Sequence, residues 1–272
     1  MDIAHDFIAD SLELDKSNIW TNISIIFTVL AVGGCFFYWS FATASYYFWF
    51  VWNKKRFFPF ETVNEAELPA QMAHEKYIAL ASIPLMAVPM LPAALFQYRG
   101  YSKMYRSIDD YGWGYFFLSI PMFFLFTDCM VYWFHRGLHH PIFYRRLHKL
   151  HHSYRFTSPY SSHAFHPLDG FGQGIAYYVF TYIFPMHNLL FIGMFVFVNF
   201  WTISIHDQVD FGGCLVNTTG HHTIHHDQFN YNYGQYLTLW DRIGGTYKVS
   251  QQTHSMFGST EDDAIVSGKK SI

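Results

Sequence analysis

The chain of 272 residues is 51% hydrophobic and 21% aromatic but only 14% charged, which is typical of a membrane protein and excludes an ordinary soluble domain. Its net charge of −3 argues against a protein that binds nucleic acid through clustered positive charge. Cys35, Cys129 and Cys214 are too widely spaced to form a disulfide framework or a thiolate zinc site, so we interpret them as small buried residues.

The first expected membrane segment lies at residues 17–53, which contain no charged residue. This length allows one spanning helix of about 20 residues, followed by an aromatic shoulder at Tyr46 to Trp52 that suits the membrane interface. Lys54, Lys55 and Arg56 end the segment. Because it lacks the pattern of a cleaved signal peptide, we expect it to remain as an anchor.

Two further apolar runs follow. Residues 77–98 are long enough to cross a membrane, and their three prolines, at positions 84, 89 and 92, predict a kinked helix. Residues 111–134 are apolar apart from Asp128 and lead directly into His135. This junction predicts that a membrane helix delivers a histidine to the membrane surface.

The last apolar run, residues 170–205, is too long for one ordinary crossing and is interrupted by Pro185, His187 and Asn188, which predicts a hairpin of two helices. The expected fold is therefore an all-α integral membrane protein with four to five membrane helices and a helical, histidine-rich cap that holds two metals. We expect one domain over residues 1–272. Its expected parts are N-terminal spans at 17–98, a catalytic region at 111–248 and a short tail at 249–272.

Charge asymmetry predicts which side of the membrane carries the histidines. Basic residues are concentrated after the third span, whereas the first 18 residues contain only Lys16, so we expect a cytosolic histidine region and a lumenal N-terminus. The basic residues are Arg136, Arg145, Arg146, Lys149 and Arg155. A two-helix hairpin returns the chain to the same side before His221. All three histidine clusters can meet only if this parity holds.

Seventeen histidines are present, and most of them fall in three short segments: HRGLHH at 135–140, HKLHH at 148–152 and HHTIHH at 221–226. Residues three or four apart share one face of a helix, so three sets of histidines are each expected to converge on a metal. These sets are His135 with His139, His148 with His151 and His152, and His222 with His225 and His226. Further candidates are His140, His163, His166, His206 and His221.

The number of imidazoles suits two metals better than one. A zinc site uses only three or four ligands and would leave most of these histidines unexplained, whereas two irons fit the set. The Glu and Glu-x-x-His pairs of carboxylate-bridged di-iron bundles are missing from the sequence. Asp128 lies seven residues before His135 on the same helical face, so it is expected to orient a ligand imidazole.

Isolated histidines have a simpler interpretation. Single histidines near a membrane surface are usually hydrogen-bonded interfacial residues, and four positions are interpreted in this way. These are His5, His74, His187 and His254. The three clusters are different, because burying so many polar rings without a metal costs several kcal/mol.

Several longer motifs resemble the fatty-acid hydroxylase and sterol desaturase superfamily and, within it, the sterol C5-desaturase family. They are RGYSK, FTDCMVYWFHRGLHH, RRLHKLHH, SHAFHPLDGF, NFWTISIHD and HHTIHHDQFNYNYGQYLTLWDRIGG, which together extend over residues 95 to 248. Fatty-acid-hydroxylating relatives place an additional HxxxH pair near the end of the last span, whereas this chain has Thr202 and His206 there.

The resemblance implies a non-haem enzyme with two iron ions that forms a C5=C6 double bond in a Δ7-sterol. It also implies O2 as the oxidant, with electrons from cytochrome b5 and its NAD(P)H-dependent reductase. No haem or flavin module is evident in the chain, so the electrons are expected from partners. The ligands implied are drawn from the ten histidines of the three clusters, with His166 and His206 as additions.

The endoplasmic-reticulum membrane is the expected location, with the histidines and the C-terminus cytosolic. The terminal residues Lys269, Lys270, Ser271 and Ile272 resemble a dilysine retrieval signal, which acts from the cytosol. The alternative within the class is a hydroxylase of sterol C4-methyl groups or of lipids, because the histidine spacing does not distinguish these products. Outside the class, the missing HExxH motif excludes a zincin-type protease. A membrane metal transporter stays the alternative there, although a transporter would distribute its ligands inside the spans.

Overall fold

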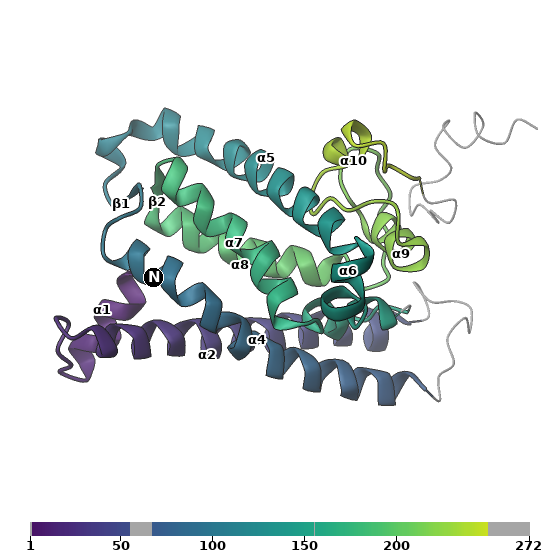
Figure 1. Ribbon diagram of the computed structural model, residues 1–272, viewed down its shortest axis with the longest axis horizontal. Helices are drawn as coiled ribbons and strands as arrows, with labels where there is room; N and C mark the ends of the chain where they lie inside the picture. Colours follow the sequence, from purple (N-terminus) through teal and green to yellow (C-terminus); the bar gives the residue numbers. More distant parts are fainter. Residues whose placement is uncertain (1, 55–66, 155, 250–272) are drawn as a thin grey trace, which may run out of the picture.

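The computed structural model describes residues 2–54, 67–154 and 156–249. Five long helices run along the length of the molecule (Figure 1). They are α2 (Ile19–Ser45), α4 (Leu68–Tyr98), α5 (Gly112–Leu138), α7 (Pro167–Ile183) and α8 (Asn188–Ser204). Lys55, Arg56, Arg155, His254 and the C-terminal lysines, for which the sequence suggests roles, lie outside the described residues.

The two ends of the bundle differ in structure. One end, on the right in Figure 1, is a cap of short elements, and the other end holds a parallel pair of two-residue strands. The cap comprises α6 (Pro141–Phe143), η3 (Tyr144–His148), η4 (His151–Ser153), η5 (Pro159–His163), α9 (Thr219–Gln228) and α10 (Leu239–Ile243). The opposite end comprises α1 (Asp2–Ser11), β1 (Met104–Tyr105), η2 (Ile108–Asp110) and β2 (Met186–His187).

Three helices of the described part are long and apolar enough to cross a membrane, as the composition predicts. They are Ile19–Trp52, Leu68–Tyr98 and Gly112–Leu138. The first combines α2 with the π-helical aromatic shoulder η1 (Tyr46–Trp52), and the third carries His135 in its last turn. The expected membrane protein and the expected junction at His135 are therefore both present.

Helix α4 is longer than its charge-free run predicts, because it begins at Leu68 and includes Glu75. The Glu75 side chain is buried and accepts hydrogen bonds from Ser158 Oγ at 2.5 Å and Gln71 Nε2 at 2.7 Å. These partners satisfy a carboxylate that would otherwise be costly to bury. The three prolines lie inside α4, and the helix bends along its length as predicted (Figure 1).

The predicted hairpin is formed by α7 and α8, and β2 lies at its tip. Each arm has 17 residues, the lower limit for a membrane-crossing helix. Since three described helices meet the length criterion outright and α8 is a shorter apolar helix, the total of four to five crossings stays a prediction.

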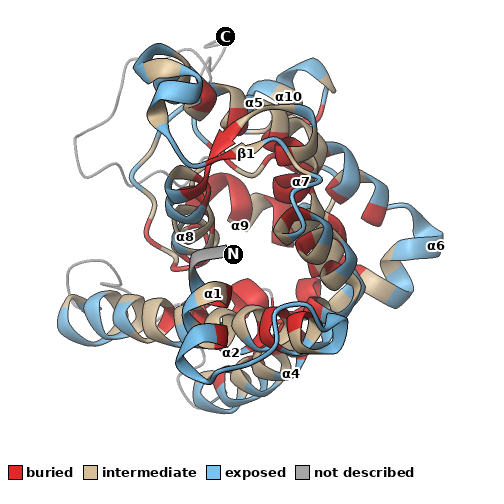
Figure 2. Ribbon diagram, turned by 90° about the vertical axis from the view of Figure 1, so that its left-hand side faces the viewer, coloured by how far each residue is buried: buried red, intermediate tan, exposed pale blue. Residues whose placement is uncertain are grey.

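Close helix contacts depend on two glycines. A Cβ atom on Gly172 of α7 would overlap the Phe134 ring of α5, and one on Gly34 of α2 would lie 2.8 Å from Ile83 Cγ2 of α4. Small residues let helices approach closely where lipid tails provide no hydrophobic driving force. Viewed along the bundle, buried residues line the inner faces of the helices (Figure 2).

The N-terminal helices also hold the segment between the second and third histidine clusters. Tyr38 Oη of α2 donates a hydrogen bond to the Tyr160 carbonyl at 2.9 Å, and Ser82 Oγ of α4 donates to the Phe165 carbonyl at 2.5 Å. Both donors and both acceptors belong to buried residues. The position of residues 156–165 therefore depends on α2 and α4, which contribute no histidine to the metal groups described below.

Candidate metal centre

The cap brings nine histidines together in two groups, within each of which the nearest ring nitrogens lie within 4.8 Å of one another. The first group is His135, His139, His148, His152 and His225. The second group is His151, His206, His222 and His226. Eight of the nine side chains are buried. Histidines far apart in the sequence therefore form two candidate metal sites at one end of the bundle.

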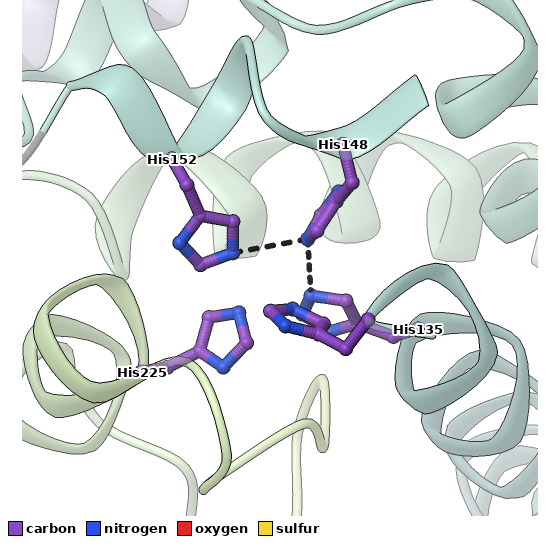
Figure 3. A group of neighbouring side chains, drawn as sticks. His135, His148, His152 and His225 are labelled. Carbon is purple, nitrogen blue, oxygen red and sulfur yellow. Dashed lines mark hydrogen bonds between the residues drawn. The ribbon is translucent and has the colours of Figure 1, made fainter. Parts of the chain in front are cut away.

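The first group combines the end of α5 with three elements of the cap. Figure 3 shows His135, His148, His152 and His225 pointing toward a common centre. Nε2 of His148 lies 3.0 Å from Nε2 of His135 and 3.1 Å from Nε2 of His152. The His225 ring, from α9, lies 4.7 Å from the His152 ring, centroid to centroid.

The second group is formed by His206, which lies two residues after the end of α8, and by histidines of α9 and η4. Nε2 of His222 lies 2.9 Å from Nε2 of His206 and 3.1 Å from Nε2 of His226. Nε2 of His151 lies 3.4 Å from Nε2 of His206. The two groups are adjacent, because the ring centroids of His152 and His226 are 4.7 Å apart.

His135 and His139 lie in one group as expected, but the grouping corrects the expectation that the second and third clusters each converge on one metal. His151 separates from His148 and His152, and His225 separates from His222 and His226. On α9 each residue turns about 100° from the previous one, so positions four apart share a face while His225 and His226 point in different directions. The second and third clusters therefore each contribute histidines to both groups.

Backbone carbonyls hold three of the imidazoles by their Nδ1–H groups. His135 donates to the Tyr233 carbonyl at 3.0 Å, His225 to the Tyr231 carbonyl at 2.8 Å and His206 to the Thr202 carbonyl at 2.6 Å. A carbonyl oxygen only accepts, so these partners place the proton on Nδ1 and leave a lone pair on Nε2.

Asp169 holds a fourth imidazole, and its role was not anticipated from the sequence. Its buried carboxylate accepts a hydrogen bond from His148 Nδ1 at 2.6 Å and another from Gln173 Nε2 at 2.7 Å. A carboxylate behind a histidine is a common second partner at metal sites. The signal was present in the sequence, since Asp169 lies in the SHAFHPLDGF motif.

Asp128 has a structural role, and the expectation that it orients an imidazole is wrong. Its carboxylate accepts three backbone N–H groups, from Gln235 at 2.9 Å, Tyr236 at 2.7 Å and Leu237 at 3.3 Å. It thereby ties the loop after α9 to α5. Spacing along a helix predicts the face on which a residue lies but not the partner that packs against that face.

The arrangement fits metal ions. The Nε2 atoms of His135 and His148 face each other at 3.0 Å, although both Nδ1 atoms are donors, so two lone pairs meet with no proton between them. A cation removes this repulsion. Nε2 atoms of His139 and His225 are also buried without a hydrogen-bond partner among the described residues. Unsatisfied buried nitrogens aimed at one centre are expected of metal ligands.

Burial keeps the imidazoles of the cap neutral, the form that binds a metal. Desolvation, with the neighbouring histidines as a further cause, lowers the pKa of His152 to about 2. The same causes lower the pKa of His151, His222, His225 and His226 well below the usual value for histidine. Protonation therefore does not compete with metal binding near neutral pH.

Four candidate ligands lie outside both groups. His140 and His166 cap the N-termini of α6 and α7, where their Nδ1 atoms face the backbone N–H groups of Ile142 and Leu168. His221 contacts Thr218 Oγ1 through Nδ1 at 3.0 Å. His163 contacts Ser162 and Asn199. The geometry joins nine of the thirteen candidates, and metal ligation by each candidate stays a prediction.

The described histidines that were interpreted as bystanders have ordinary hydrogen-bond partners. Nε2 of His5 lies 3.0 Å from Asn22 Oδ1, and Nδ1 of His74 lies 2.9 Å from Tyr154 Oη. His187 donates from Nε2 to the Arg106 carbonyl at 2.9 Å, at the end of the bundle opposite the cap.

A mainly apolar pocket connects the metal groups with the interior of the bundle. It lies between α4, α7 and α8, and it is lined by His135, His151, His206 and His222 beside Met90, Tyr177, Tyr178, Phe195 and Val198. A smaller polar part of the lining is formed by Ser162, His163, Gln173, Asn199, Thr202 and Gln235. The lining therefore suits a mainly apolar molecule.

The comparisons with known proteins agree on one family. The model of the family described as "Fatty acid hydroxylase" matches residues 120–246. Lathosterol oxidase of Mus musculus is 41% identical over 240 residues, which cover 86% of this chain and 78% of the relative. A Delta(7)-sterol 5(6)-desaturase of Schizosaccharomyces pombe is 40% identical over 248 residues, which cover 91% and 74%. One of Candida albicans is 42% identical over 248 residues, which cover 90% and 62%.

No solved structure gives a significant match to the chain.

The Asp169–His148 hydrogen bond generates a prediction about metal binding. Replacing Asp169→Ala frees the His148 ring to rotate, so we expect metal affinity to fall about 10- to 100-fold. Elemental analysis of the purified protein after dialysis against a graded chelator measures this loss. Asp227→Ala is the matched control, because Asp227 is exposed and next to His226 in α9. Equal metal retention in both variants would contradict the assigned role of Asp169.

Proposed function

This chain belongs to the lathosterol oxidases and Delta(7)-sterol 5(6)-desaturases of the fatty acid hydroxylase family, and from this membership we propose that it is a sterol C5-desaturase. Its reaction forms the C5=C6 double bond of a Δ7-sterol in sterol biosynthesis. The observation that carries the proposal is the apolar pocket that opens onto two groups of convergent histidines.

The metals proposed for the two groups are non-haem iron ions. Imidazole ligands suit iron, and a reaction with O2 requires a redox-active metal, which excludes zinc. We propose the nine grouped histidines as the ligands. Iron held there would supply the oxidising power for removing hydrogen from an unactivated C–H bond.

The atoms and electrons of the proposed reaction balance. A Δ7-sterol, one O2, two electrons and two protons give a Δ5,7-sterol and two molecules of water. The C–H bonds at C5 and C6 break and a C=C bond forms, while O2 accepts the four electrons. The protein must hold the ligand imidazoles by Nδ1, place C5 and C6 beside the metal groups and exclude water. The Nδ1 partners and the mainly apolar pocket suit these tasks.

The proposed site of action is the endoplasmic-reticulum membrane, with the cap and the C-terminus cytosolic and the N-terminus lumenal. The arrangement supports this topology, because both metal groups lie at one end of the bundle and α1 lies at the other (Figure 1). We also propose that residues 1–272 act as one domain, since α4 lines the pocket with Met86 and Met90.

Electrons are proposed to enter from cytochrome b5, which its NAD(P)H-dependent reductase reduces, at the outer surface of η3. Arg145, Arg146 and Lys149 are exposed there, whereas His148 of the same segment is buried in the first metal group. The Tyr144 ring of η3 contacts the first group, with its centroid 5.6 Å from that of His139 and 5.8 Å from that of His152. A basic surface this close to the metal suits an acidic electron donor.

The proposed function predicts a specific product. Cells that lack their own C5-desaturase and are supplied with a Δ7-sterol should accumulate the Δ5,7-diene when they express this chain, because C5 and C6 are placed at the metals. Mass spectrometry of extracted sterols measures the product. A stable hydroxylated or C4-demethylated sterol with no diene would instead assign the chain to the rival hydroxylase function.

Two histidine variants test the metal assignment. His151→Ala removes a member of the second group and should lower iron from about two ions per chain and abolish turnover. His187→Ala, at the opposite end of the bundle, should leave iron and turnover largely intact, with at most a modest loss of stability. Iron analysis and turnover of equally expressed protein decide the comparison. Equal iron loss in both variants would overturn it.

The basic surface predicts an ionic-strength effect on electron delivery. The double variant Arg145→Glu, Arg146→Glu should lower turnover with cytochrome b5 roughly tenfold at low salt, and the wild-type rate should fall as salt screens the attraction. Iron content should not change. Lys103→Glu is the matched control, because Lys103 is exposed beside the strand pair at the far end. An equal effect of Lys103→Glu would place donor binding elsewhere.

A further inference from the structure

The polar part of the pocket contains a pair of side chains that the metal groups do not use. We propose that Asn199, held by His163, binds the 3-hydroxyl group of the sterol and thereby sets the position of C5 at the metals. The inference rests on the proposed function, because it assumes a sterol as the substrate. It assigns His163 to substrate positioning instead of metal binding.

The location of the pair is the first argument. Asn199, Thr202 and His206 are three and four residues apart, so they follow one face along α8 and its end, and all three line the pocket. His163 is close to the second metal group from another direction. Its ring centroid lies 5.9 Å from that of Phe165, which in turn lies 6.0 Å from that of His151.

The hydrogen bonds of the pair leave capacity for a ligand. Asn199 Nδ2 donates to the Phe195 carbonyl at 2.8 Å, so its Oδ1 is directed at His163 Nε2, which donates at 3.1 Å. His163 Nδ1 then lies 3.0 Å from Ser162 Oγ, whose single hydrogen is directed at the Pro159 carbonyl at 2.7 Å. Nε2 of His163 is therefore engaged by Asn199, and Asn199 itself retains one amide hydrogen and one oxygen lone pair.

This remaining capacity matches a hydroxyl group, which donates one hydrogen bond and accepts others. In a 3-hydroxysterol only C4 lies between the hydroxyl-bearing C3 and the reacting C5. The hydroxyl group must therefore lie near the metals whenever C5 does, inside a pocket that is otherwise mainly apolar. A hydroxyl group buried there without a partner would bind poorly. Asn199 provides the partner and fixes the sterol along its length.

The test compares the binding of two sterols by purified protein. Radiolabelled Δ7-sterol with a 3-hydroxyl group should bind wild-type protein about tenfold more tightly than its 3-deoxy counterpart, since one hydrogen bond to a neutral partner has this effect. Asn199→Leu conserves the side-chain size and should remove the preference while iron content stays unchanged. Asn22→Leu is the matched control, because it removes a buried amide near the far end and should keep the preference.

Each result has a definite meaning. Equal binding of both sterols by wild-type protein would overturn the proposal. This comparison does not depend on the folding of any variant. A preference that persists in folded Asn199→Leu would also overturn it. Failure of the desaturase assignment is recognised separately. If the product is C4-hydroxylated and the protein still prefers the 3-hydroxyl sterol, the assigned reaction is wrong but the proposed binding site is retained.

Discussion

The convergence of imidazole lone pairs is the constraint on which the rest of the structure depends. Nε2 atoms from separate elements approach within 2.9–3.4 Å, which is unfavourable until a cation lies among them. The surrounding structure makes this approach stable by holding four rings through Nδ1, with three backbone carbonyls and the Asp169 carboxylate. These acceptors select the tautomer that presents Nε2 to a metal.

The alternating direction of the helices explains how the rings meet. Helices α5 and α8 both run toward the cap, so each delivers a histidine there, and α7 carries the chain back between them (Figure 1). Short helical elements of the cap, η3, η4 and α9, supply the remaining histidines of the two groups. Asp128 shows that the cap is anchored from the bundle, since this residue of α5 binds three consecutive backbone N–H groups after α9.

The pocket connects the two histidine groups with the apolar interior of the helix bundle. Its lining includes residues of α4 and α7 beside the grouped histidines, so helices without any grouped histidine still shape this space. The polar side chains of the pocket are coupled to the metal groups. Gln173 shares Asp169 with His148, and Gln235 donates to Thr202 Oγ1, while the Thr202 carbonyl holds His206. The polar side chains of the pocket and the grouped histidines therefore share hydrogen-bond partners.

The sequence by itself determined the membrane class, the two helices of the hairpin and the three histidine segments, because hydropathy and local spacing are properties of neighbouring residues. It also separated His5, His74 and His187 from the clusters. It did not determine that His151 and His225 leave their local clusters, that Asp169 rather than Asp128 holds an imidazole, or that α4 extends to Leu68 around a buried Glu75. Those outcomes depend on which distant carbonyl, carboxylate or hydroxyl group packs against each side chain, and only the tertiary structure decides this.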